Sequence, residues 1–176
     1  MRMCGAGEVE CVKFSDYRGS MFFAHRDNCL SPEAGLDVAR IYLCLNYADF
    51  QNATIVNSAC KFKNVGKSIF FEEAIWNSAQ KKSEAAVREL VDNAIAHSDV
   101  VAFLIGQNTY ANKFCQYALR ESIEKKKGIF GIHLPNQMAK GSSDWLTSKR
   151  YPVHDWDSNN LKSWVITAVQ KSLTKA

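Results

Sequence analysis

Residues 100–105 read Val-Val-Ala-Phe-Leu-Ile and are followed by Gly106. A continuous apolar run of this length, closed by a glycine, is typical of a strand buried on both faces of a sheet. The segment before this strand, residues 83–97, is expected to be a helix with Ser83 as its N-cap. That segment has one apolar stripe at helical spacing: Val87, Leu90, Val91, Ala94 and Ile95. A helix that leads into a buried strand is the unit of a parallel α/β sheet, so this stretch decides the fold class.

Similar units lie on both sides of this stretch. Residues 41–45 read Ile-Tyr-Leu-Cys-Leu, residues 68–71 read Ser-Ile-Phe-Phe, and residues 129–134 read Ile-Phe-Gly-Ile-His-Leu. Residues 151–154 predict a weak edge strand, where their proline is tolerated. Helices are expected up to about residue 60, over 111–126, and along the C-terminal stripe of Leu161, Trp164, Val165, Ala168 and Val169. The pattern predicts a flavodoxin-like, doubly wound parallel sheet of about five strands with helices on both faces.

The regular pattern does not extend to the start of the chain. Residues 1–39 mix glycine, charges and isolated aromatic residues, so we expect an N-terminal extension whose order the sequence leaves open. Residues 40–176 are expected to form one domain. Across the 176 residues, 47% are hydrophobic and 23% are charged, which is the composition of a globular protein and not of a disordered one.

Charge and cysteine content exclude several classes of function. The net charge is only +4, and the densest basic run, residues 125–127, lies at an expected helix end, so we expect no nucleic-acid binding. The six cysteines form no CxxC pair, so no metal site is expected. Cys44 and Cys115 are expected to be buried thiols. The first residues lack an apolar leader and no run is long enough to span a membrane, so the expected location is the cytoplasm.

The carboxyl ends of the strands are where a doubly wound sheet binds its ligands. Four expected loops converge there: residues 46–50, 72–76, 106–114 and the segment after Leu134. They carry the aromatic residues Tyr47, Trp76, Tyr110 and Phe114 and the polar residues Asn46, Asp49, Glu72, Glu73, Asn108 and Asn112. Aromatic walls with a few polar anchors suit a flat, nucleotide-type ligand. The alternative is that these aromatic side chains only cap the core.

Common catalytic motifs are absent from the sequence. There is no GxxxxGK[ST] loop, no GxGxxG after the first strand and no GxSxG elbow. His133 ends a strand at the expected edge, where it could contact a ligand, but we favour a structural histidine with satisfied hydrogen bonds. The residues alone therefore indicate an α/β domain with a possible nucleotide cleft, and a flavin would also fit such a cleft.

Longer segments carry a family resemblance. Residues 40–47 read R-I-Y-L-C-L-N-Y, residues 71–76 read F-E-E-A-I-W, and residues 101–110 read V-A-F-L-I-G-Q-N-T-Y. Residues 114–119 read F-C-Q-Y-A-L, and residues 122–133 run from S-I-E-K to G-I-H. In this order and spacing, over about residues 40–170, the chain resembles the TIR-like domains of the bacterial Thoeris anti-phage system.

The resemblance implies an enzyme that cleaves the bond between nicotinamide and ribose in NAD+ and makes an ADP-ribose-based signal. NAD+ would be the substrate and not a permanently bound cofactor. The implied partners are an effector protein activated by that signal and further copies of the chain. The implied substrate-binding residues are Tyr42, Cys44, Asn46, Tyr47, Asp49, Glu72, Trp76, Asn108, Tyr110, Phe114 and Tyr117.

One position departs from the family at its catalytic residue. The family keeps a glutamate in a segment that reads W-V-x-Y-E-I, and Ala118 stands at that position here. The resemblance therefore implies an inactive or strongly impaired enzyme, either by deliberate replacement or as a natural pseudoenzyme. Glu121, one helical turn further on, and Glu72 or Glu73 are weaker candidates to replace the missing carboxylate.

Two further differences from the family pattern lie in the first strand and the loop after it. Cys44 stands where the family has a serine, and Asn46 where it often has a histidine, which leaves the product open. The alternative function is a non-catalytic scaffold or nucleotide-sensing module that acts by self-association.

Overall fold

The protein is described by a computed structural model that covers residues 39–174. Apart from Ala39, the expected N-terminal extension lies outside the described residues. The strands are β1 (Arg40–Leu45), β2 (Lys67–Ile69), β3 (Val100–Ile105), β4 (Gly128–His133) and β5 (Val153–Asp155). The helices are α1 (Phe50–Phe62), α2 (Glu73–Lys82), α3 (Glu84–Ala96), α4 (Lys113–Glu124), α5 (Asp144–Thr147) and α6 (Leu161–Leu173), and short 3-10 turns are η1 (Tyr47–Asp49) and η2 (Thr109–Ala111).

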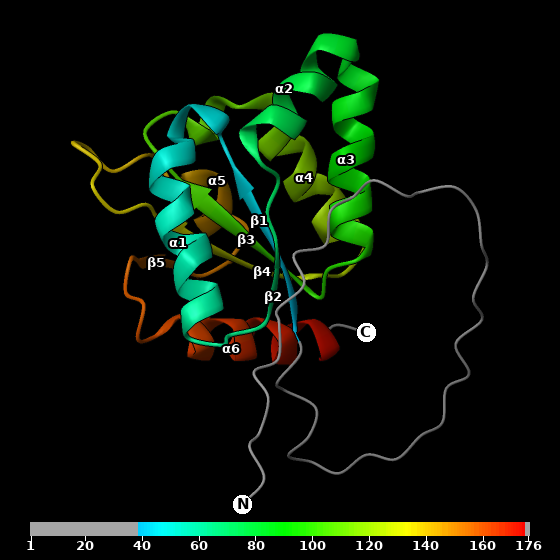
Figure 1. Ribbon diagram of the computed structural model, residues 1–176. Coiled ribbons are helices and arrows are strands. Elements are labelled where there is room, and N and C mark those ends of the chain that lie inside the picture. The colour runs from blue at the N-terminus through cyan, green and yellow to red at the C-terminus, as the bar shows by residue number, and fades with distance from the viewer. Residues whose placement is uncertain (1–38, 175–176) are drawn as a thin grey trace, which may run out of the picture. The chain divides into compact units, whose positions relative to one another are not determined.

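All five strands pair in parallel, in the order β2-β1-β3-β4-β5, as Figure 1 shows. This confirms the doubly wound α/β fold. From β1 the chain moves outward to β2, and from β3 it moves outward in the opposite direction to β4 and β5. The topological switch point therefore lies between the carboxyl ends of β1 and β3, where sheets of this kind bind ligands.

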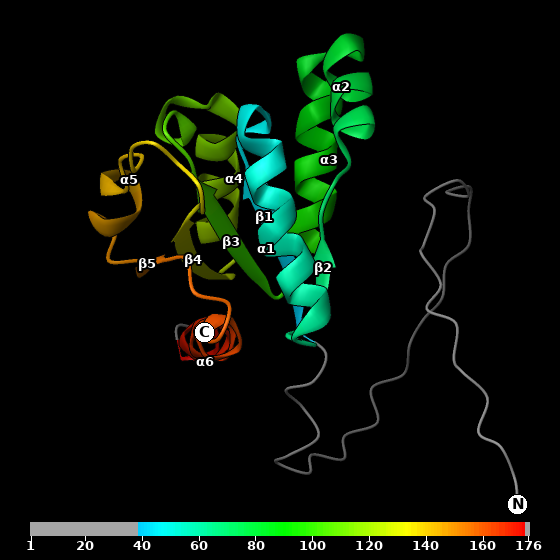
Figure 2. The ribbon, with the colours of Figure 1, turned by 60° about the vertical axis from the view of Figure 1, so that its left-hand side comes forward.

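Helices cover both faces of the sheet (Figure 2). Helices α1 and α6 pack on one face, and α2, α3, α4 and α5 contribute to the core on the other. Every residue of β3 is buried, and its side chains alternate between the two cores. Since burial of one large apolar side chain contributes about 1.5–3 kcal/mol, a strand without polar residues is stable only at the centre of such a sheet.

The helix before β3 matches its prediction. The Ser83 hydroxyl oxygen accepts a hydrogen bond from the Ala86 amide at 3.1 Å, so Ser83 is the N-cap of α3. The basic run at residues 125–127 follows α4, and the Lys127 ammonium donates to the Ser98 carbonyl at 2.6 Å, just beyond α3. Lys127 therefore satisfies a carbonyl of the neighbouring helix end and not of its own.

Two expected loops contain helices. Residues 72–76 were expected to be a loop but include the start of α2, because Trp76 and Ala79, three residues apart, turn one side of this segment into the core. The polar segment 135–150 contains the single turn α5, which buries Leu146. In both cases too few apolar residues point inward to give a readable period. Among the described residues, no helix has the length and apolar content needed to cross a bilayer.

Candidate functional site at the carboxyl edge

Asn112 joins the two loops that meet at the switch point. Its side-chain oxygen accepts hydrogen bonds from the amides of Phe114 at 2.9 Å and Cys115 at 3.2 Å, so it is the N-cap of α4. Its amide nitrogen donates to the side-chain oxygen of Asn46 at 3.0 Å. Asn46 lies directly after β1, and one side chain thus fixes the start of α4 to the loop after β1.

The carboxylate of Asp49 lies directly over Gly106, at the end of β3. A Cβ atom on Gly106 would collide with this carboxylate, so the close approach requires glycine here. The Gln137 side chain donates to Asp49 at 3.3 Å, and Gly141 packs on the Gly106 backbone. Thr109 accepts a hydrogen bond from the Gly106 amide at 2.8 Å. Asp49 is therefore the carboxylate that the fold holds at the switch point.

Three of the expected aromatic residues pack against one another. The rings of Tyr47 and Trp76 stack with their centroids 4.2 Å apart, and Phe114 meets Trp76 edge-on at 5.5 Å. The Tyr47 hydroxyl donates to the Phe71 carbonyl at 3.1 Å. These rings close the top of the core, as in the alternative interpretation of the sequence, and they do not stand apart as the walls of an open cleft.

Beneath the rings lie two thiols and a second phenol. Cys44 and Cys115 are buried, as predicted, and both are free thiols. The nearby Cys44 thiol and burial raise the pKa of the Cys115 thiol. Burial also raises the pKa of Tyr42 and, with the nearby thiols, the pKa of Tyr47. The phenols and the Cys115 thiol therefore stay neutral at neutral pH, and this thiol lacks the lowered pKa of a nucleophile.

Ala118 is fully buried on the side of α4 that faces the sheet, one turn beyond Cys115. Helical side chains lean toward the helix N-terminus. Because α4 begins at the carboxyl edge, a longer side chain at this position would extend toward that edge. Glu121 does not occupy this space: its carboxylate lies 3.7 Å from the Lys125 ammonium and 3.9 Å from the Arg120 guanidinium.

Tyr117 lies apart from this group, against α3. Its hydroxyl donates to the two carboxylate oxygens of Asp92, at 2.8 and 2.9 Å. The guanidinium carbons of Arg88 and Arg120 lie 5.0 and 5.3 Å from the centre of its ring. Burial and the hydrogen bond to Asp92 raise the pKa of Tyr117 to about 12. Its present partners thus belong to the α3–α4 packing.

The remaining candidates lie around the edge with exposed side chains. Glu72 precedes α2, and Asn108 and Tyr110 belong to the turn that leads into α4. The structure thus brings together Asn46, Tyr47, Asp49, Trp76 and Phe114, with Tyr42 and Cys44 below them. No role was predicted for Gly106, Gln137 or Gly141. The position of Gly106 at the end of β3 could have indicated a close backbone approach, whereas nothing in the sequence indicates that Gln137 contacts Asp49.

His133, at the end of β4, differs from its prediction. Its Nδ1 atom is buried and has no hydrogen-bond partner within residues 39–174, although a satisfied structural histidine was expected. Burial lowers the pKa of His133; the carboxylate of Asp155 on β5 opposes this shift and Lys140 adds to it. Within the same range, no group of three or more His, Cys, Asp or Glu side chains is placed to hold a metal ion.

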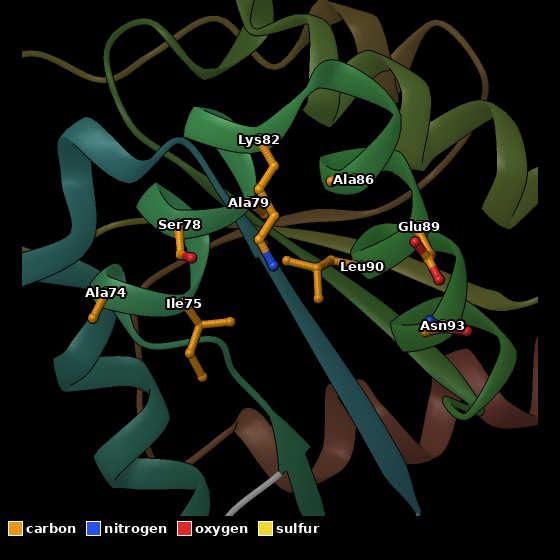
Figure 3. Close-up of a pocket in the computed structure, with 9 residues that line it drawn as sticks. All are labelled: Ala74, Ile75, Ser78, Ala79, Lys82, Ala86, Glu89, Leu90 and Asn93. Carbon is orange, nitrogen blue, oxygen red and sulfur yellow. The ribbon is translucent and has the colours of Figure 1, made fainter. Parts of the chain in front are cut away.

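A groove of about 500 Å³ lies between α2 and α3 (Figure 3). Its residues from α2 are Ala74, Ile75, Ser78, Ala79 and Lys82, and those from α3 are Ala86, Glu89, Leu90 and Asn93. This groove was not predicted from the sequence, because α2 itself was not predicted.

The sheet order and the residues gathered at its switch point define a class: a doubly wound α/β domain with its candidate ligand site at the carboxyl edge. The amino-acid sequence identifies one family within that class. Residues 42–139 match the family model of the Thoeris protein ThsB, TIR-like domain, and the chain belongs to this family.

Two comparisons accompany the family match. A Bacillus cereus (strain MSX-D12) relative described as "Putative cyclic ADP-D-ribose synthase ThsB1" is 28% identical over 98 residues, which are 54% of this chain and 51% of the relative. The aligned part thus spans about half the length of this curated relative. The crystal structure of the IL-17 receptor B SEFIR domain superimposes with a TM-score of 0.53 at 12% identity, over 78% of this chain and 98% of that domain. At this identity the likeness concerns the fold alone.

Proposed function

We propose that this TIR-like domain binds NAD+ at the carboxyl edge, between the loops after β1 and β3, and cleaves it poorly. The observation that carries the proposal is the family match, because residues 42–139 include both loops and the whole of α4. The description of the Bacillus cereus relative names cyclic ADP-D-ribose as the product, and NAD+ contains the ADP-ribose unit from which such a product is built. In this proposal NAD+ is a substrate, and the ADP-ribose-based product acts on a separate effector protein.

The chemistry places one main demand on the site. The C–N bond breaks so that its electron pair leaves with the positively charged nicotinamide, which departs neutral and needs no proton. The ribose becomes an oxocarbenium-like cation, and a carboxylate held close to it stabilises that charge. Ala118 supplies no carboxylate, and Asp49 remains the acidic group at the switch point. We therefore expect NAD+ to be bound without efficient cleavage.

Binding also requires movement of the aromatic group. Tyr47 and Trp76 lie face to face at 4.2 Å, so a flat nicotinamide or adenine ring can stack on either inner face only after the pair separates. The ligand then selects the open arrangement and stabilises it.

The second candidate function is a non-catalytic nucleotide sensor. It is favoured by the surroundings of Ala118, which is fully buried in a cluster of apolar, aromatic and thiol side chains. A sensor of this kind binds the nucleotide and changes its assembly without chemical turnover.

The deciding experiment compares Ala118→Glu with Ala118→Gln in the full chain. The two side chains have nearly the same size, and only glutamate adds a carboxylate. After circular dichroism has verified folding, NAD+ consumption is followed and the products are analysed by mass spectrometry. We expect Ala118→Glu to release nicotinamide about 100-fold or more faster than Ala118→Gln, the typical effect of a group that stabilises transition-state charge.

Equal, negligible turnover by two folded variants would reject the enzyme and leave the sensor. If the buried position does not accept either side chain, NAD+ titration of the unmodified chain still decides whether the edge is a nucleotide site. No detectable binding there would reject both functions.

A further inference from the structure

The α2–α3 groove carries charges of opposite sign on its two walls. Lys82 comes from α2 and Glu89 from α3, and both side chains are exposed (Figure 3). Neither has an ion-pair partner among the described residues, whereas the neighbouring Glu84 is paired with both Arg88 and Lys113. The groove thus presents one unpaired cation and one unpaired anion on opposite sides.

Between the charges the groove is apolar and lined by small side chains. Ile75 on α2 is 44% exposed, and Figure 3 shows it pointing toward Leu90 of α3. The short side chains of Ala74, Ala79 and Ala86 leave space in the groove beside these two larger side chains. Figures 1 and 2 both place α2 and α3 side by side. Small residues next to larger apolar ones let a second pair of helices approach closely.

This charge pattern is complementary to itself. A two-fold axis that runs along the groove, in the plane of contact, brings the α2 wall of one copy against the α3 wall of the other. The same operation, applied to a surface with a cation on one wall and an anion on the other, sets unlike charges opposite each other twice. A surface with like charges on both walls would instead repel its own copy.

We propose that the α2–α3 groove is the interface of a symmetric homodimer, in which Lys82 pairs with the partner's Glu89 and Glu89 pairs with the partner's Lys82. Ile75 and Leu90 of both copies fill the centre between the two ion pairs. None of these side chains is among the candidate substrate-binding residues, so the interface is tested separately from the proposed NAD+ chemistry.

The interface is tested by exchanging charges on exposed side chains. Lys82→Glu places Glu opposite Glu twice, and Glu89→Lys places Lys opposite Lys twice. Each variant alone is therefore expected to dimerise at least about tenfold more weakly than the unmodified chain. An equimolar mixture of the two restores both unlike pairs and is expected to form the heterodimer, and the double variant is expected to form the homodimer again.

Sedimentation velocity of the full chain, over a range of concentrations and at low salt, measures these states, because the dimer has twice the 19.8 kDa of one chain. Lys81→Glu and Glu124→Lys make the same charge changes at exposed positions outside the groove and should leave dimerisation unchanged. A native chain that stays monomeric throughout would overturn the proposal. So would a dimer that both single variants leave intact, or single variants that fail to associate when they are mixed.

Discussion

Asn112 illustrates how a single side chain organises the candidate site. Its oxygen caps α4, the helix that carries Ala118, and its nitrogen is bonded to Asn46 in the loop after β1. An N-cap that also forms a tertiary contact fixes both the start of the helix and the position of a distant loop. The sequence indicated a polar residue at this edge, but not its partner, because residues 46 and 112 meet only through the pairing of β1 with β3.

Replacement of Asn112 by alanine should therefore lower stability. The change leaves two amides at the start of α4 without their side-chain acceptor and frees Asn46. The free energy of unfolding in urea is expected to fall by about 1–2 kcal/mol. Asn108→Ala is the matched control, since Asn108 is exposed and makes no side-chain capping bond. Equal stability of the two variants would show that the Asn112 contacts contribute nothing.

His133 and His154 should make the fold sensitive to mild acid. Burial lowers the pKa of both side chains below their ordinary value of 6.5. Between the lowered pKa and 6.5, the unfolded chain binds more protons than the folded one. Stability therefore decreases as the pH falls below about 6.5 and is recovered as the pH rises. Urea unfolding at a series of pH values between roughly 7.5 and 5 measures this slope of stability against pH.

The pH prediction has its own variants. His133→Gln and His154→Gln should each flatten the slope, because glutamine does not titrate. The exposed His97→Gln controls for the loss of a histidine as such. A slope that survives in the variant lacking both His133 and His154 would assign the acid sensitivity to other groups.

At the level of elements, α2 depends on one aromatic anchor. Trp76 is 3% exposed, stacks on Tyr47 and meets Phe114 edge-on, which ties α2 to the loop after β1 and to the start of α4. Ala79 is its other buried residue. The helix is thus held mainly by aromatic contacts at its first turn, next to the candidate site.

Trp76→Ala is expected to reduce the free energy of unfolding by about 3–5 kcal/mol, because it removes a buried ring and leaves a cavity. Denaturant unfolding followed by circular dichroism measures the change. Ile123→Ala on α4 is a control of similar chemistry at a 38% exposed position, where a loss below about 1 kcal/mol is expected. If Trp76→Ala cost no more than this control, the aromatic group would not be what holds α2.

The elements that the sequence predicted share a physical cause. Strands β1, β3 and β4 are buried on both faces, so their apolar runs are continuous, and α3 carries a full apolar stripe. Helix α2 was not predicted because only Trp76 and Ala79 face inward. Helix α5 was not predicted because it is a single turn. The bounds of β2 and β5 shifted because edge strands are short and only partly buried, which weakens their pattern.

For the molecule as a whole, the order of strands and helices along the chain was enough to predict the edge of the sheet at which the candidate site lies. Parallel strands that alternate with helices put the loops after β1 and β3 at one edge, and the observed strand order makes that edge the switch point. The packing within the edge was beyond sequence reasoning, because helix periodicity does not tell which aromatic side chains meet. Trp76 and Phe114 turn toward the edge, whereas Tyr117 turns toward Asp92 of α3.

We propose that this TIR-like domain holds NAD+ at the switch point and that Ala118 leaves it without an efficient catalytic carboxylate. Calorimetric titration of NAD+ into the unmodified full chain tests both parts at once, since binding releases heat in discrete peaks and turnover sustains a heat flow. We predict peaks that diminish to saturation at one NAD+ per chain, with a baseline that returns to its starting level after each injection. A titration without any binding heat would show that the chain does not bind NAD+, and a baseline displaced by continuing turnover would show that it cleaves NAD+ efficiently.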